Sequence, residues 1–172
     1  MLGRAAVSPA GVTIRPAGIQ DAPEIVRVYV DSWNAGFGTR MRVIAADEAR
    51  IERWRRDLGD GTPMCWWVAE RDGVVVGVVG IGPCRDPAIA GLGELDTIAV
   101  SPSAWHGGVG KALMKVALQG LRDASYHSAA LWTLSDYPLG ESFYVATGWR
   151  LNGATRDHGN QARYDHDLGV GN

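Results

Sequence analysis

The segment Val100-Ser-Pro-Ser-Ala-Trp105-His-Gly-Gly-Val-Gly110-Lys-Ala-Leu-Met114 joins a predicted strand to a predicted helix through a cluster of glycines. Residues 94–100 are predicted to form the strand, and apolar residues recur at helical spacing from about 109 to 124. A helix that begins there directs its unsatisfied backbone N–H groups, and the positive end of its dipole, towards one point. Glycines also let a ligand approach the main chain closely, so the segment predicts a phosphate-binding loop.

Two common phosphate loops do not fit this segment. A Walker loop needs a serine or threonine after its Gly-Lys pair, and here Gly110-Lys111 is followed by Ala112. A dinucleotide-binding fold needs its glycine pattern directly after the first strand, whereas this loop lies late in the chain. The segment therefore indicates a phosphate site of a third type.

The residues before the loop predict a strand, two helices and a hairpin. Residues 12–14 are predicted as a strand, and Asp21 is expected to begin a helix, with Glu24 completing a capping box. Asp47 is expected to cap the second helix. The runs 66–70 and 74–81 then predict an antiparallel hairpin that turns at Asp72-Gly73.

The residues after the loop predict a strand over 129–134, a short helix over 141–147 with Gly148 as its C-cap, and closing strands over 149–151 and 162–168. Together these elements predict an α/β fold of the α+β type, with one mixed sheet and helices on its faces. Residues 1–10 are expected to be a flexible N-terminus, and residues 11–172 one domain.

Composition narrows the choice of partners. With a net charge of −2 and a pI of about 6.1, the chain lacks the basic excess that binding to a nucleic acid requires. The longest apolar run, 74–81, is too short to cross a membrane. Cys65 and Cys84 are interpreted as thiols, which favours a cytoplasmic location. The four histidines and two cysteines show no metal-ligand spacing, so no metal is expected.

The glycine segment resembles the pyrophosphate loop of the GNAT superfamily of acetyl-CoA-dependent N-acetyltransferases. The match rests on Val100-Ser-Pro102 and on Gly108-Val-Gly110, while Trp105 stands where that family usually has glutamine or arginine.

A second stretch, Phe143-Tyr144 followed by Gly148-Trp149, resembles the family's later motif. Tyr137 and Gly140 replace the asparagine and alanine that often precede it. The resemblance implies a mostly antiparallel mixed sheet that is splayed at its centre.

The resemblance also implies acetyl-CoA as co-substrate and an amine as acceptor. Tyr144 then matches the tyrosine that contacts the cofactor and protonates the leaving thiolate. Main-chain groups of the preceding strand pair with the pantetheine arm, and the loop holds the diphosphate. The residues implied at these positions are Ile98, Ala99 and Val100 on the strand, and Trp105, His106, Gly107, Gly108, Val109, Gly110 and Lys111 in the loop.

Aminolysis of a thioester also needs a base, because an ammonium group has no lone pair. Glu94 is the chosen candidate, acting directly or through a water and contacting the acceptor. Asp96 shares its face of the strand and is the second candidate. A solvated strand end is the alternative interpretation. Trp33 and Phe37 lie where the family builds its acceptor pocket, and core packing explains them equally well.

Other functions remain open at this point. A non-catalytic module of the same fold would bind acyl-CoA without turnover, and the departures at Trp105, Tyr137 and Gly140 keep that alternative open. Propionyl- or succinyl-CoA would suit the same chemistry as donors. The sequence does not decide the acceptor amine, or between a monomer and a homodimer.

Overall fold

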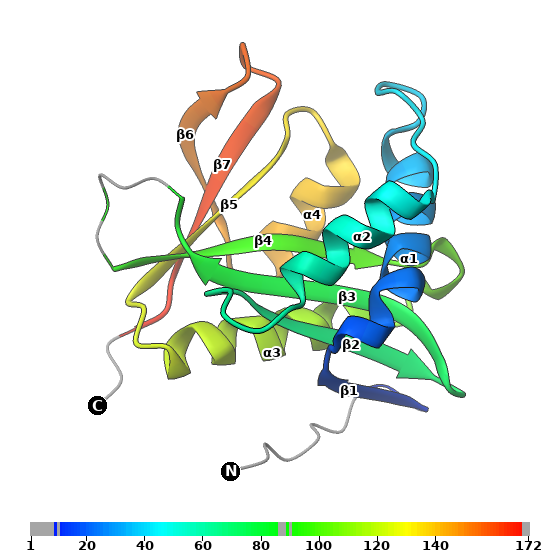
Figure 1. Ribbon diagram of the computed structural model, residues 1–172. Helices are drawn as coiled ribbons and strands as arrows, with labels where there is room; N and C mark the ends of the chain where they lie inside the picture. Colours follow the sequence, from blue (N-terminus) through cyan, green and yellow to red (C-terminus); the bar gives the residue numbers. More distant parts are fainter. Residues whose placement is uncertain (1–8, 10, 86–88, 90, 170–172) are drawn as a thin grey trace. The chain divides into compact units, whose positions relative to one another are not determined.

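The computed structural model describes residues 9, 11–85, 89 and 91–169, so nine of the ten residues predicted as a flexible N-terminus lie outside the described part. Seven strands form one sheet in the order β1-β2-β3-β4-β5-β7-β6 (Figure 1). The β1–β2, β5–β7 and β6–β7 pairs are antiparallel, and β4–β5 is parallel. The predicted order of strands and helices is confirmed. In chain order the elements are β1 (Val12–Pro16), η1 (Ile19–Asp21), α1 (Ala22–Phe37), α2 (Glu48–Asp57), β2 (Cys65–Arg71), β3 (Val74–Pro83), β4 (Leu92–Val100), η2 (Pro102–Ala104), α3 (Val109–Asp123), β5 (Ser128–Leu134), α4 (Pro138–Ala146), β6 (Arg150–Arg156) and β7 (Gln161–Asp167).

The chain divides into two compact units. The first contains residues 1–80 and 97–116, and the second contains residues 81–96 and 117–172. The first unit therefore holds β1, β2, α1, α2 and the glycine segment, while β5, α4, β6 and β7 belong to the second. The strands β3 and β4 and the helix α3 each pass from one unit into the other.

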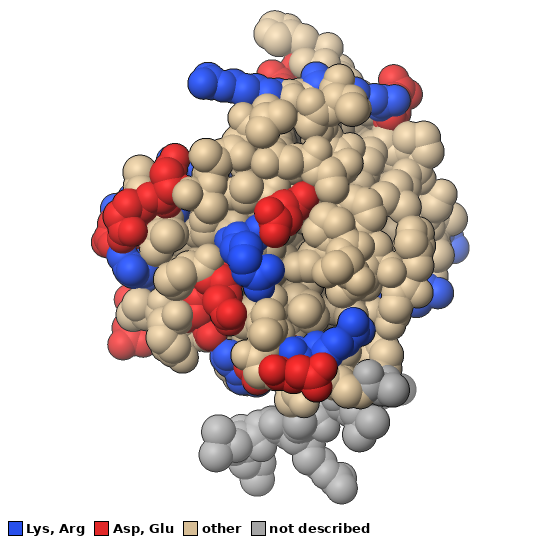
Figure 2. Space-filling model, turned by 90° about the vertical axis from the view of Figure 1, so that its right-hand side faces the viewer, with Lys and Arg blue, Asp and Glu red and all other residues tan. Residues whose placement is uncertain are grey.

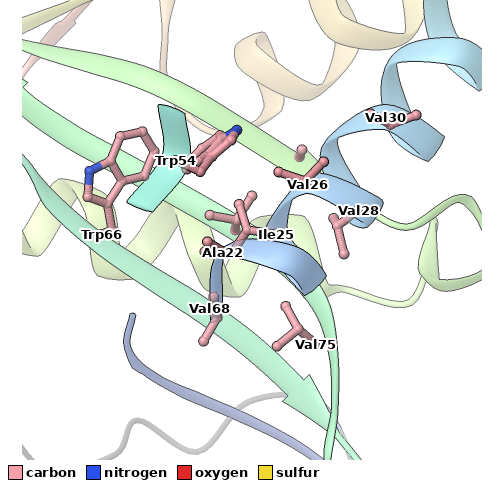
Figure 3. Packing of buried hydrophobic residues seen from close by; sticks show 11 residues of the cluster. Ala22, Ile25, Val26, Val28, Val30, Trp54, Trp66, Val68 and Val75 are labelled. Carbon is pink, nitrogen blue, oxygen red and sulfur yellow. The ribbon is translucent and has the colours of Figure 1, made fainter. Parts of the chain in front are cut away.

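In the first unit, α1 and α2 pack on one face of β2 and β3, over the cluster of aliphatic and tryptophan side chains drawn in Figure 3. The Trp54 and Trp66 rings meet edge to face, with centroids 4.7 Å apart. Gly80 makes room for this contact, because a Cβ there would lie 2.1 Å from the Trp66 ring. On α3, Leu113 Cδ1 lies 2.8 Å from where a Cβ of Gly77 would be. Helices therefore cover both faces of these strands, as predicted.

Two local predictions in the first unit are confirmed. The Asp47 carboxylate accepts a hydrogen bond from the Arg50 N–H at 2.8 Å, which caps α2. Asp72 and Gly73 have φ angles of 51° and 75°, the left-handed pair that a two-residue hairpin turn needs.

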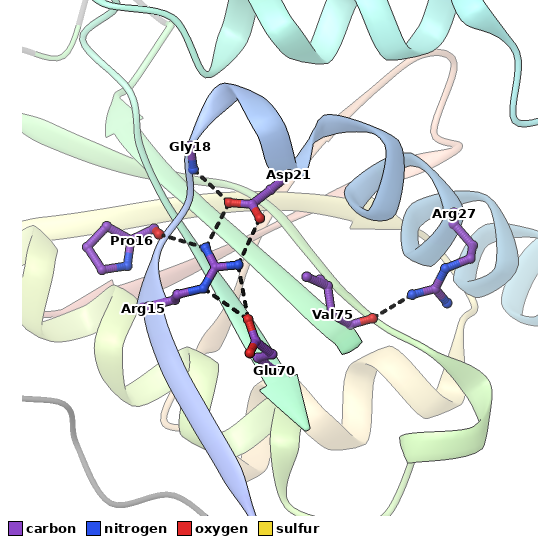
Figure 4. A network of polar contacts seen from close by, with 7 residues as sticks. All are labelled: Arg15, Pro16, Gly18, Asp21, Arg27, Glu70 and Val75. Atoms are coloured by element: carbon purple, nitrogen blue, oxygen red, sulfur yellow. Dashed lines mark hydrogen bonds and ion pairs between the residues drawn. The ribbon is translucent and has the colours of Figure 1, made fainter. Parts of the chain in front are cut away.

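The capping box predicted at Asp21 is wrong. Asp21 stands at the N-cap position of α1, but its side chain makes no capping bond. Its carboxylate instead accepts two bonds of 2.8 Å from the Arg15 guanidinium and one of 2.8 Å from the Gly18 N–H (Figure 4). Arg15 also pairs with Glu70 of β2, at 3.0 Å. The carboxylate joins β1 to η1, and Arg15 in turn links β1 to β2, so the carboxylate does not close the first turn of α1.

In the second unit, two predicted boundaries move. Helix α4 begins at Pro138 instead of residue 141, because proline fits the first turn, where a missing N–H costs nothing. Strand β6 continues to Arg156 instead of ending at residue 151. All seven of its residues are exposed, so no apolar alternation marks it. Pairing with β7 defines this strand.

Charges of both signs are interspersed on the face of the molecule in Figure 2, where lysine and arginine lie beside aspartate and glutamate.

Among residues 9, 11–85, 89 and 91–169, no helix is long and apolar enough to cross a membrane. Within the same ranges, no three histidine, cysteine, aspartate or glutamate side chains gather as a metal site would require. Cys65 and Cys84 are not joined in a disulfide.

Candidate active site

The glycine segment bends from β4 through η2 into α3. His106 and Gly108 both have left-handed backbones, with φ angles of 60° and 83°. The first bond that ties α3 to this bend runs from the Ala112 N–H to the Gly108 carbonyl, at 3.1 Å. The N–H groups of residues 109–111 precede that bond, so they lie at the open, positive end of the helix. An anion such as a diphosphate suits this position.

Trp105 ties the bend together. Its indole Nε1–H donates to the carbonyl of Val100, the last residue of β4, at 2.7 Å. The Ser101 N–H donates to the Val76 carbonyl of β3 at 2.9 Å, which fixes the other side of the bend. The Trp105 side chain, which replaces the family's usual glutamine or arginine, therefore uses its one polar N–H in a hydrogen bond within the loop. A contact between the rest of the indole and a cofactor stays a prediction.

The glycines of the bend have different local reasons to lack a side chain. Gly108 needs its positive φ, and a Cβ there would also lie 2.9 Å from Cγ of Pro9. At Gly107 a Cβ would lie 3.3 Å from the Ala104 carbonyl oxygen and 3.7 Å from the Arg71 guanidinium. The side chains of His106 and Lys111 are exposed, whereas Val109 is buried. Val109 can thus contribute only main-chain groups to a ligand.

The strand that enters the bend has main-chain positions outside its parallel ladder. Pairing between β4 and β5 covers Leu92–Glu94, and β4 continues to Val100. Ile98, Ala99 and Val100 lie beyond that ladder, as an added-strand mode of pantetheine binding requires. Ala99 is buried in the core of the first unit, while Ile98 and Val100 are half-buried.

Glu94 and Asp96 lie side by side, as strand alternation predicts, and the structure adds a third group. Glu94 is only 5% exposed, so it is not a solvated strand end. Its Oε1 accepts a bond from the Arg85 guanidinium at 3.2 Å, and its Oε2 accepts one from the Arg85 backbone N–H at 3.1 Å. The same guanidinium nitrogen bonds Asp96 Oδ1. Arg85 was not predicted, because the contact depends on how the loop after β3 returns to β4.

Tyr144 lies on α4, with its ring against two other aromatic rings of the second unit. The centroids of Phe143 and Tyr164 are 5.5 Å and 5.8 Å from its own. Burial raises the pKa of Tyr144 to about 12, although a hydrogen bond with the Thr133 side chain of β5 acts in the opposite direction. The phenol is therefore fully protonated at neutral pH, as a proton donor to a thiolate must be.

Tyr137 and Gly140, the two residues that differ from the family's later motif, lie in contact with each other. A Cβ at position 140 would lie 2.5 Å from Cδ1 of the Tyr137 ring, so the ring occupies the space of an alanine methyl group. Burial raises the pKa of Tyr137. The tyrosine at 137 and the glycine at 140, which both differ from the family motif, therefore form a single packing contact.

Trp33 and Phe37 lie together on α1, with ring centroids 5.0 Å apart. The Trp33 indole N–H donates to the Arg42 carbonyl at 3.2 Å. The Asn34 side chain makes two bonds of 2.9 Å with the backbone of Ile44. These residues hold the segment between α1 and α2 against the end of α1. A role in acceptor binding stays a prediction.

Known proteins share this sequence pattern and this fold. The sequence model of the acetyltransferase (GNAT) family matches residues 22–149. N-acetyltransferase 8B of Mus musculus is 37% identical over 91 residues, which are 52% of this chain and 39% of that protein. The uncharacterized N-acetyltransferase YuaI of Bacillus subtilis is 24% identical over 128 residues, 74% of each chain. The aligned part of this chain thus covers well under half of the mouse relative's own length.

Solved structures are similar over nearly the whole chain. The paiA N-acetyltransferase of Thermoplasma acidophilum, in complex with coenzyme A, aligns with a TM-score of 0.70 at 19% identity, covering 91% of this chain and 98% of that one. A GCN5-related N-acetyltransferase from Kribbella flavida aligns with a TM-score of 0.74 at 18% identity, with the same coverage of both chains. At such identities these likenesses show the fold alone.

Proposed function

Because the chain belongs to the acetyltransferase (GNAT) family, we propose that it transfers an acetyl group from acetyl-CoA to a primary amine of a small molecule or peptide. The amine attacks the thioester carbonyl directly, the C–N bond forms, and CoA leaves as a thiolate that gains a proton. The observation that carries this proposal is the start of α3, where a left-handed Gly108 leads directly into the first turn of the helix. Main-chain N–H groups at that position suit the diphosphate of CoA.

Two side chains take the proton-transfer roles. Tyr144 donates its proton to the departing thiolate, and its raised pKa of about 12 means that this proton is present at neutral pH. Glu94 removes the proton of the attacking amine, directly or through a water. Its Oε1 and Oε2 already accept bonds from Arg85, so the amine or water uses their remaining lone pairs. Each such step contributes about 10²–10⁴-fold to the rate.

The backbone supplies the remaining contacts. Ile98, Ala99 and Val100 pair with the pantetheine arm, and one of their N–H groups polarises the thioester carbonyl. Trp105, His106, Gly107, Gly108, Val109, Gly110 and Lys111 surround the diphosphate. Contacts with the acceptor are assigned to Trp33, Phe37 and Glu94.

The test is release of CoA when the protein is incubated with acetyl-CoA and a panel of amines. Acetylated amine and free CoA should appear in equal amounts, and both should be absent when the amine is omitted. Mass spectrometry is the better readout, because the exposed Cys65 thiol would react with a thiol dye. Binding of acetyl-CoA without product across the panel would instead identify a non-catalytic acyl-CoA-binding module. The same assay with propionyl- and succinyl-CoA ranks the donors.

A further inference from the structure

Arg85 bridges the two carboxylates of β4 from the loop that follows β3. Its guanidinium bonds Glu94 at 3.2 Å and also Asp96, and its backbone N–H donates to the other oxygen of Glu94 at 3.1 Å. The three groups belong to the same compact unit. With two carboxylates and one guanidinium, these side chains carry a formal charge of −1.

The three side chains differ in their exposure to solvent. The Glu94 side chain is 7% exposed and that of Asp96 is 20% exposed, whereas that of Arg85 is 73% exposed. A strand fixes the carboxylates, while the arginine reaches them from solvent. The positive charge of Arg85 therefore lies directly beside both carboxylates.

We propose that Arg85 determines acceptor specificity by disfavouring amines that carry a second positive charge. This inference rests on the proposed function, in which the acceptor amine approaches Glu94. One ammonium group balances the formal charge of the three side chains. A second ammonium group close to the first adds a positive charge beside the guanidinium, and the two repel each other.

The charge of Arg85 can be removed with little change to the fold. Arg85→Gln keeps a side-chain donor for the carboxylates and the backbone N–H for Glu94, but it carries no charge. Arg85→Lys keeps the charge. The matched control is Arg55→Gln, because Arg55 on α2 also bridges two carboxylates, those of Glu48 and Glu52.

The experiment compares acetylation of n-butylamine and of 1,4-diaminobutane, which differ in one charge at equal chain length. We expect Arg85→Gln to raise the diamine-to-monoamine ratio of kcat/KM about ten-fold, as loss of one nearby charge at a partly screened site predicts. Arg85→Lys and Arg55→Gln should leave the ratio within about two-fold of the unmodified protein, since the first keeps the charge and the second removes a remote one.

Salt gives a second measurement. Raising the salt concentration from 20 mM to 500 mM screens the charge of Arg85, so the difference in this ratio between Arg85→Gln and the unmodified protein should shrink. A ratio that Arg85→Gln leaves unchanged at 20 mM salt, in a protein that acetylates amines, would overturn the inference and leave the proposed function intact. Failure of the unmodified protein to acetylate any amine would overturn the proposed function, and this inference with it.

Discussion

Gly108 has a φ of 83°, and a Cβ at this position would lie 2.9 Å from Cγ of Pro9. Under the proposed function, the diphosphate of CoA also needs this space. Gly108→Ala should weaken CoA binding at least about ten-fold, equivalent to losing one or two charge-assisted hydrogen bonds. Isothermal titration with CoA measures this. Gly73→Ala is the control, because Gly73 has a φ of 75° with open space around its Cβ position. Both variants should lose roughly 1–2 kcal/mol of stability from left-handed strain. Unchanged CoA affinity in Gly108→Ala would mean that the bend is only a turn.

Tyr144→Phe should lower kcat about ten-fold or more with little change in affinity for acetyl-CoA, because a proton donor acts only in the transition state. Steady-state kinetics measures the effect, and titration with acetyl-CoA measures the affinity. Tyr164→Phe makes the same substitution in the adjacent ring and should leave kcat within about two-fold. With a pKa of about 12 for Tyr144, no loss of rate between pH 6 and pH 10 should come from its ionisation. A kcat equal in Tyr144→Phe and the unmodified protein would remove Tyr144 from the mechanism.

At the scale of elements, the segment between α1 and α2 depends on few bonds. Asn34→Ala removes both bonds to the Ile44 backbone and should cost about 1 kcal/mol for each bond. Hydrogen exchange of residues 39–46 should become faster, while exchange in β2 and β3 changes little. Gln119→Ala removes an exposed helix bond to Asp123 and serves as control. Equal exchange in the segment with and without Asn34 would show that the other bonds, such as those of Trp33 and Arg50, are sufficient to hold it.

Elements set by local chemistry were predicted well, and those set by distant contacts were not. Asp47 caps α2 and Asp72-Gly73 turns the hairpin because each uses neighbours within three residues. Asp21 fails as a cap because Arg15, on β1, competes for its carboxylate. The sequence likewise brings Glu94 and Asp96 together but gives no signal for Arg85, whose approach depends on how the chain returns from β3.

At the scale of the whole molecule, acid stability should depend on Asp21. The Arg15 guanidinium, through its hydrogen bond, holds the pKa of Asp21 below its ordinary value, an effect that burial partly opposes. Because the folded pKa is lowered, the stabilisation is present above about pH 4, the unfolded value, and is lost as the pH falls through the folded pKa.

Asp21→Asn should therefore lose about 2 kcal/mol at pH 7, less than a fully buried pair, because the Arg15 side chain is 37% exposed. Its loss relative to the unmodified protein should shrink below pH 4. Urea unfolding at pH 7 and pH 3 measures both. Glu52→Gln breaks an exposed pair with Arg55 and should leave stability almost unchanged at either pH. A constant difference for Asp21→Asn across this range would rule out titration of Asp21 as its source.

The contact between Tyr137 and Gly140 bears on how this chain can be engineered. With 2.5 Å between the Tyr137 ring and the Cβ position of residue 140, restoring the family's alanine alone forces the two groups into overlap. Asparagine at 137 takes away the ring that fills this space. Alanine at 140 should therefore be tolerated better together with asparagine at 137 than alone, so the effects of the two changes should not add. A library that varies the two codons jointly would retain this pair, whereas changing position 140 by itself would not.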